Sequence, residues 1–131
     1  MDKTLHAAAK AALTHAYVKY SHFPVGAALK LKDGTIITGV NIENASFGLT
    51  NCAERTALFT AYAQGYRKDD IDAILITTKK DRIVSPCGAC RQVMNELMPA
   101  DAPVTMVDAT GNHTTVKNAE LLPLGFSEDD L

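Results

Sequence analysis

Apolar residues recur at helical spacing near the N-terminus. Leu5, Ala9, Leu13 and Tyr17 repeat every four residues, which predicts an amphipathic helix over about 4–20. Small alanines lie alongside this stripe, so we expect the helix to pack closely on a neighbouring sheet.

The pattern then changes to short β-branched runs. Runs at 25–32 and 35–40 flank Asp33-Gly34, a strong hairpin signal, and therefore predict two antiparallel strands. Residues 41–50 are rich in Asn, Ser and Gly and predict a loop with exposed polar groups.

A second helix follows this loop. Asn51 is a candidate cap for a helix that runs to about Gln64, with Gly65 as its stop. The apolar run 71–78 then predicts a buried strand, and the charged residues 79–82 after it predict a solvated turn.

Proline marks both ends of the third predicted helix. Ser85 as cap and Pro86 as first helical residue begin it, and it ends near Met98, ahead of another proline. Residues 104–107 predict a short strand, and 116–122 fit a strand, a short helix or both in succession. Helices alternate with strands, which predicts an α/β fold with a mixed sheet and helices on its faces.

Composition narrows the class of protein. The 131 residues are 47% hydrophobic, the size of one compact domain, so we expect a single domain over 1–131. A net charge of −2, with 13 basic and 15 acidic residues interspersed, offers no positive field for nucleic acid. No apolar run approaches the roughly 20 residues that span a bilayer, and we expect a cytoplasmic protein.

Three cysteines and one carboxylate carry the candidate chemistry. Cys52 precedes Glu54 by two residues, and Cys87 and Cys90 form a C-x-x-C after Pro86. Zn²⁺ held by three protein ligands keeps a fourth position open for water, and the zinc deaminases combine a ligand-x-Glu with Pro-Cys-x-x-Cys. The motifs predict a hydrolytic Zn²⁺ site with Glu54 as the acid and base.

Three simpler interpretations stay open from the residues alone. Glu54 lies three residues after Asn51 and could complete a capping box. Cys87 and Cys90 could form a redox pair. Cys52 could be a small buried apolar residue.

Zinc with three thiolates is anionic, so positive potential must lie nearby. Helix N-termini at both motifs supply part of it. Arg55 follows Cys52 by three residues and Arg91 directly follows Cys90, and we expect both arginines to donate hydrogen bonds to the sulfurs.

Several motifs together resemble one known family, the cytidine deaminases of the short single-domain type. They occur in the family's order over residues 20–28, 39–46, 51–57 and 86–92. The resemblance implies a three-layer α/β/α sandwich with a mixed central sheet and zinc bound by Cys52, Cys87 and Cys90. It also implies that free cytidine and deoxycytidine are hydrolysed to uridine and deoxyuridine in pyrimidine salvage. Zinc-bound hydroxide attacks C4 of the base, Glu54 shuttles the protons, and ammonia leaves.

The same resemblance implies how substrate is held. Asn41 and Glu43 hold the ribose, Phe23 packs on the pyrimidine, and Phe126 reaches into a neighbouring subunit's site. Short members of the family are homotetramers with sites completed at subunit interfaces. Phe47 departs from the tyrosine of many relatives, which puts one local contact in doubt.

Two other functions compete with this one. A deaminase of a blasticidin-type antibiotic also uses a three-cysteine zinc site, although Asn41 and Glu43 favour a nucleoside. A non-catalytic zinc-binding domain would use Glu54 only as a cap. A nucleotide deaminase would need a cationic phosphate pocket, which the sequence does not indicate.

Overall fold

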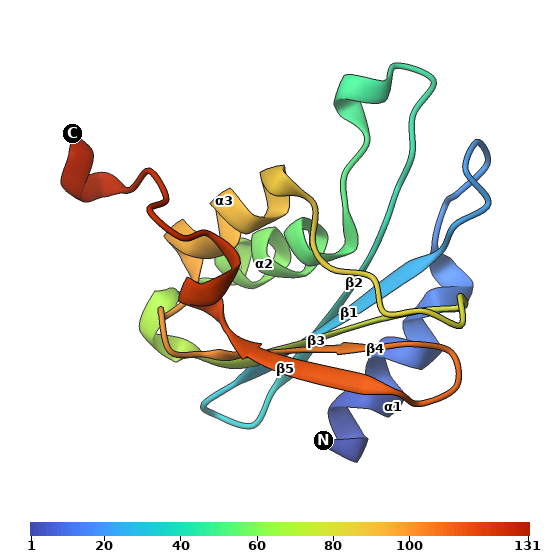
Figure 1. The fold of residues 1–131 in the computed structure, drawn as a ribbon, viewed down its shortest axis with the longest axis horizontal. Helices are drawn as coiled ribbons and strands as arrows, with labels where there is room; N and C mark the ends of the chain where they lie inside the picture. Colours follow the sequence, from blue (N-terminus) through green and yellow to red (C-terminus); the bar gives the residue numbers. More distant parts are fainter.

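A mixed five-stranded sheet forms the centre of the computed structural model, which describes residues 1–131 (Figure 1). Along the sheet the order is β2-β1-β3-β4-β5, and only β3 and β4 are parallel. The strands are β1 (Val25–Leu31), β2 (Ile36–Val40), β3 (Ile71–Thr78), β4 (Pro103–Val107) and β5 (His113–Lys117).

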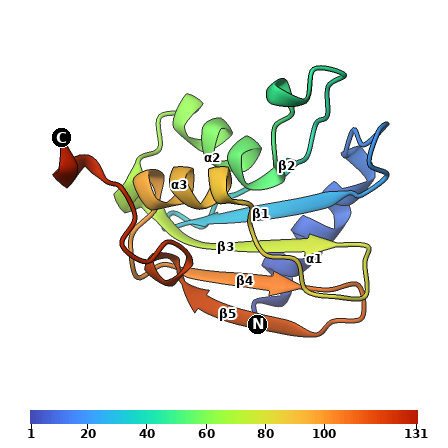
Figure 2. The same cartoon turned by 45° about the horizontal axis from the view of Figure 1, so that its top comes forward.

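Helices cover both faces of this sheet. They are α1 (Lys3–Ala12), α2 (Ala53–Ala63) and α3 (Gly88–Leu97). Figure 2 shows α1 on one face and α2 with α3 on the other. Successive side chains of β1 point to opposite faces of the sheet and so contribute to two hydrophobic cores. Ala28 packs with α1, whereas Ala27 and Leu29 pack with α2 and α3. The predicted three-layer α/β/α sandwich is confirmed.

The close approach of α1 to the sheet is also confirmed. Ala9 is fully buried against β1. A Cβ placed on Gly26 of β1 would lie 2.4 Å from the carbonyl oxygen of Ala9. Only glycine at this position allows α1 to pack so closely.

The predicted strands agree with the structure. Gly34 adopts a φ of 91° in the β1–β2 turn, as the hairpin signal requires. The uncertain segment after β4 contains both alternatives in succession, because β5 is followed by a short 3-10 helix over Asn118–Leu121. No helix in the chain has the length and apolar character needed to cross a bilayer.

The predicted extent of the first helix is wrong. The α-helix ends at Ala12, a 3-10 turn follows over Leu13–His15, and Ala16 is extended. Tyr17 instead forms a β-bridge with Ile42, and its backbone N–H donates to Asn41 at 3.0 Å. Pairing with this distant segment overrides the local helical pattern.

Both predicted helix starts are also corrected. The N-cap of α2 is Cys52 rather than Asn51, and that of α3 is Cys87 rather than Ser85. Neither helix has a side-chain capping bond, so the capping-box interpretation of Glu54 is wrong. The thiol groups of Cys52 and Cys87 do not bond to the backbone N–H groups of their own helices. Both sulfurs therefore lie at helix N-termini without being used as caps.

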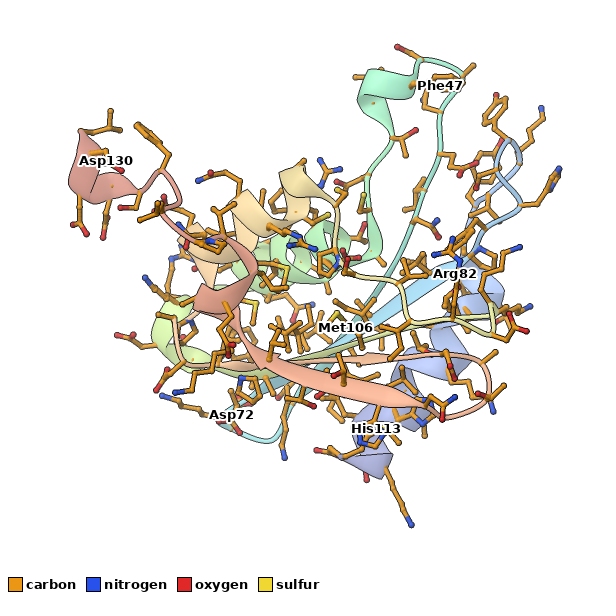
Figure 3. The ribbon with its side chains drawn as sticks, viewed as in Figure 1. Phe47, Asp72, Arg82, Met106, His113 and Asp130 are labelled. Carbon is orange, nitrogen blue, oxygen red and sulfur yellow. The ribbon has the colours of Figure 1, made fainter.

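Two segments project from the body of the molecule. One is the connection between β2 and α2, which carries Phe47 with 78% of its surface exposed (Figure 3). The other is the C-terminal tail, which carries Asp130 and extends beyond α3 (Figures 1 and 3).

Candidate metal centre and adjoining cavity

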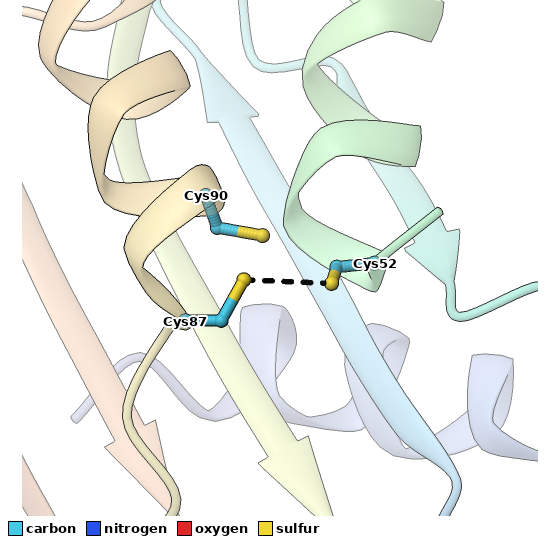
Figure 4. Close-up of side chains that lie close together, drawn as sticks. All are labelled: Cys52, Cys87 and Cys90. Atoms are coloured by element: carbon cyan, nitrogen blue, oxygen red, sulfur yellow. Dashed lines mark hydrogen bonds between the residues drawn. The ribbon is translucent and has the colours of Figure 1, made fainter. Parts of the chain in front are cut away.

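Three thiols from two helix starts converge at one point (Figure 4). Their sulfurs all lie within 4.8 Å of one another, and the Cys52 and Cys87 sulfurs are 3.7 Å apart. Cys90 is fully buried in the first turn of α3, whereas Cys87 is exposed. Because the Cys52 sulfur joins those of Cys87 and Cys90, the geometry favours a three-thiol cluster over a redox pair.

The spacing of these sulfurs fits Zn²⁺. Tetrahedral Zn²⁺ with Zn–S bonds of about 2.3 Å separates its sulfurs by about 3.8 Å. The Cys52 to Cys87 distance of 3.7 Å matches this value. Thiolates are preferred zinc ligands, and three of them leave one corner of the tetrahedron for water. Cys52, Cys87 and Cys90 are therefore positioned to bind Zn²⁺.

Glu54 lies beside this cluster. Its side chain is only 4% exposed and lines a cavity of about 140 Å³ together with Cys52 and Cys87. Burial raises the pKa of the Glu54 carboxyl, and negative charge at Cys52 adds to this effect. A buried carboxyl group with a raised pKa therefore lies at the edge of the three-thiol cluster.

The two arginines behave differently. Arg55 donates from Nη2 to the Cys52 sulfur at 3.3 Å, as expected. Arg91 donates to no sulfur, and this expectation is wrong. Its three donor nitrogens bind Ser85 Oγ, the carbonyl oxygen of Pro86 and the carbonyl oxygen of Leu121.

Asn41 lines the same cavity, and its side-chain amide also holds the backbone at Phe23 and Val25 by two hydrogen bonds. Nδ2 donates to the carbonyl oxygen of Phe23 at 2.8 Å, and Oδ1 accepts from the backbone N–H of Val25 at 2.9 Å. Phe23 is half-buried beneath Lys80 and Arg82, whose charged ends lie 5.3 and 5.8 Å from its ring centroid. Two residues of the turn predicted to be solvated therefore contact the expected base-binding ring.

Of the four residues expected to bind substrate, only Asn41 lines this cavity; Phe23, Glu43 and Phe126 do not. Glu43 accepts from the backbone N–H groups of Tyr20 and Ser21, both at 3.0 Å, and from the Ser21 hydroxyl. It borders a second hollow of about 380 Å³ with Tyr20 and Phe47. Phe126 is 56% exposed on the tail.

Several apolar residues of the cavity wall are not predicted from the sequence. Val25, Ile76 and Val84 line the cavity. Val25 lies within a motif already singled out, and Val84 directly precedes the Ser-Pro-Cys motif. Ile76 has no distinguishing signal, because it looks like any residue of a buried strand.

Comparisons with known proteins agree with this geometry. Residues 1–106 match the family model described as the cytidine and deoxycytidylate deaminase zinc-binding region. A cytidine deaminase from Halalkalibacterium halodurans is 56% identical over 88% of this chain and 86% of its own length. A blasticidin-S deaminase from Bacillus cereus is 33% identical over 80% of this chain and 78% of its own.

A solved structure gives the same answer for the fold. The crystal structure of a cytidine deaminase from Burkholderia pseudomallei superimposes with a TM-score of 0.93, at 47% identity, covering 96% of this chain and 99% of that one. With its three-thiol zinc site beside a buried glutamate, the chain belongs to the cytidine deaminase family of enzymes.

Proposed function

We propose that the protein hydrolyses free cytidine and deoxycytidine to uridine and deoxyuridine, releasing ammonia, as a step of pyrimidine salvage. The observation that carries this proposal is the buried carboxyl group of Glu54, which lines the cavity beside the three thiols. The identity to a cytidine deaminase over most of the chain supports the substrate class.

The chemistry divides between the metal and Glu54. When bound, Zn²⁺ lowers the pKa of a water ligand to about 7. Glu54 accepts one proton from the water and passes it to the ring nitrogen, while the water oxygen bonds to the adjacent amino-bearing carbon. Glu54 then takes the remaining proton of the added hydroxyl and delivers it to the amino group, which leaves as ammonia when its C–N bond breaks. Water and nucleoside thus give the keto base and ammonia with all protons accounted for.

Arg55 offsets the charge of the thiolates. Its guanidinium donates to the Cys52 sulfur, and α2 and α3 both direct their N-termini at the site. These positive groups would reduce the electron donation from sulfur to a bound Zn²⁺ and so favour ionisation of its water.

We propose that four residues hold the nucleoside, of which Asn41 lines the cavity and Glu43 borders the second hollow. In this proposal Phe23 packs on the pyrimidine. Asn41 and Glu43 bind ribose hydroxyls, using donor and acceptor positions that are not already engaged in hydrogen bonds to the surrounding loops. Phe126 of a neighbouring subunit completes the site.

A homotetramer in the cytoplasm is part of the same proposal. The loop bearing Phe47 and Leu49 and the tail bearing Leu124 expose large apolar side chains, each more than 70% exposed. Such side chains are typical of surfaces that become covered on association. Three free thiols fit a reducing compartment. Light scattering coupled to gel filtration tests the subunit number.

The second candidate is deamination of a blasticidin-type antibiotic. It is favoured by the similarity to the Bacillus cereus enzyme, although the identity is lower than to the cytidine deaminases. Ammonia release from cytidine, deoxycytidine, their monophosphates and blasticidin S distinguishes the candidates. We expect turnover of the two nucleosides and little with the other compounds.

One pair of variants tests the role of Glu54. We expect Glu54→Gln and Glu54→Ala to keep about one zinc per chain while deamination falls by about two to four orders of magnitude. Elemental analysis on the same samples measures the metal. Wild-type turnover by either zinc-loaded variant would rule out Glu54 as the proton shuttle.

A further inference from the structure

The connection that delivers Cys87 to the metal site has almost no hydrogen bonding of its own. Residues 81–86 lie between β3 and α3 and form no backbone–backbone hydrogen bond. Every hydrogen bond that reaches these six residues comes from Arg91. Without Arg91, the segment before Cys87 would be held only by packing and by the cation–π contact of Arg82 with Phe23.

Arg91 donates two hydrogen bonds to the end of this connection. Nε donates to the carbonyl oxygen of Pro86 at 2.7 Å, and Nη2 donates to Ser85 Oγ at 2.9 Å. Pro86 is buried, so its carbonyl oxygen depends on this partner. The planar guanidinium fixes both acceptors in one orientation, which a lysine would not do.

Of the three cysteines, Cys87 has the fewest contacts of its own that fix the position of its sulfur. Cys90 is fully buried inside α3, and Cys52 is half-buried and accepts a hydrogen bond from Arg55. Cys87 is exposed, is the N-cap of α3, and follows Pro86 directly. The position of its sulfur therefore depends on the backbone that Arg91 holds.

The third donor of Arg91 reaches the C-terminal segment. Nη1 binds the carbonyl oxygen of Leu121 at 3.0 Å. Three residues earlier, the amide of Asn118 donates to the carbonyl oxygen of Met94 at 2.8 Å, nearer the other end of α3. The short segment Asn118–Leu121 is thus hydrogen-bonded to α3 at both of its ends, through Asn118 and through Leu121.

We infer that Arg91 is a positioning residue that couples the Asn118–Leu121 segment to the Cys87 ligand and so slows zinc release. Arg91 contacts neither the metal ligands' sulfurs nor the cavity. It acts by holding Ser85 and Pro86 while it is itself anchored on Leu121. The residue expected to tune sulfur charge instead fixes sulfur position.

Arg91→Met tests this inference because methionine preserves much of the side-chain volume and removes all donors. Zinc release from the loaded protein is followed by the colour of the chelator 4-(2-pyridylazo)resorcinol. We expect release to be about 10- to 100-fold faster, the usual cost of losing an outer-shell partner. Hydrogen exchange should rise at residue 91, whose backbone N–H donates to the carbonyl oxygen of Cys87 at 3.0 Å, and stay unchanged in β3. Deaminase activity should recover when zinc is added in excess.

Gln92→Met is the matched control. Gln92 is the next residue of α3 and binds the carbonyl oxygen of Phe126 at 2.8 Å, but it does not contact Ser85 or Pro86. We expect its zinc release to remain within about two-fold of wild type. If Gln92→Met accelerates release as much as Arg91→Met, the effect is a general loosening of α3 and the inference is wrong.

Ser85→Ala provides a second test that should not endanger folding, because Ser85 is exposed. It removes one of the three acceptors, and we expect release to be about 2- to 10-fold faster, the value of one ordinary hydrogen bond. Wild-type release in both Ser85→Ala and Arg91→Met would overturn the inference. Since the readout is zinc release, a wrong substrate assignment would leave this result unaffected.

Discussion

Gly39 of β2 lies directly against Ala53, the first residue of α2. A Cβ on Gly39 would come within 2.4 Å of the Ala53 carbonyl oxygen and 2.5 Å of the Ala57 nitrogen. Both are backbone atoms, so the helix could not make room by turning a side chain. Because Cys52 is the N-cap of α2, this approach sets the height of the first zinc ligand above the sheet.

We therefore predict that Gly39→Ala destabilises the protein by about 1–3 kcal/mol, the usual cost of overpacking a core. The displaced helix should also carry Cys52 away from Cys87 and weaken zinc binding. Urea unfolding and chelator competition measure the two effects. Gly48→Ala is the control, since a Cβ there meets no atom within 4 Å. Equal stability of the two variants would contradict the prediction.

Asn41 should contribute to stability as well as to substrate binding. Its amide joins the carbonyl oxygen of Phe23 to the N–H of Val25, so Asn41→Ala leaves both groups without their partner. We predict a loss of about 1–3 kcal/mol in stability together with a raised KM for cytidine. A residue that contacted only ribose would raise KM without this loss. Thermal unfolding without substrate separates the two cases.

Much of the fold could be predicted because its signals are local. β3 is a buried β-branched run, and Asp33-Gly34 fixes the hairpin whatever the rest of the chain does. The end of α1 could not be predicted, because it depends on pairing between Tyr17 and Ile42, which lie 25 residues apart. Local periodicity contains no information about that contact.

The site shows the same division. The three cysteines and Glu54 could be found from spacing, since each motif opens a helix and both helices begin at one end of the sheet. Arg55 contacts the sulfur of Cys52, three residues before it on the same helix face. Arg91 directly follows Cys90, and adjacent residues of a helix point about 100° apart. Adjacency in sequence was therefore a poor guide to contact.

Asp2 provides a prediction about acid stability. It is the N-cap of α1, accepts from the Leu5 N–H at 3.0 Å, and pairs with Lys30 at 3.2 Å. The Leu5 hydrogen bond, with help from Lys30, lowers the pKa of the Asp2 carboxyl below its ordinary value. A depressed carboxyl pKa stabilises the fold above the unfolded-state pKa of about 3.9 and ceases to do so as pH falls through the folded-state value.

We accordingly predict that Asp2→Ala costs about 1 kcal/mol near pH 7, the usual value of an N-cap, and that the difference from wild type shrinks below about pH 4. Parallel urea unfolding from pH 3 to pH 7 measures it, and zinc loss at low pH affects both proteins alike. Asp2→Asn keeps a capping oxygen and should retain most of the stability. A difference that is constant over the whole range would show that the carboxylate charge is irrelevant.

Removal of zinc should reveal unequal thiols. In the metal-free cluster, the hydrogen bond from Cys90 and the guanidinium of Arg55 lower the pKa of Cys52 to about 5, whereas the bond to Cys52 and burial raise the pKa of Cys90. Cys52 is therefore a thiolate at pH 7 and Cys90 a thiol, and only the thiolate is a nucleophile. We predict that iodoacetamide modifies Cys52 well before Cys90 in chelated, phosphine-reduced protein at pH 7. Peptide mass mapping over time measures both sites. Arg55→Met should slow modification of Cys52 at pH 6, because loss of the guanidinium raises the pKa of Cys52. Equal rates of modification at Cys52 and Cys90 in the wild-type protein would contradict the assignment of the thiolate to Cys52.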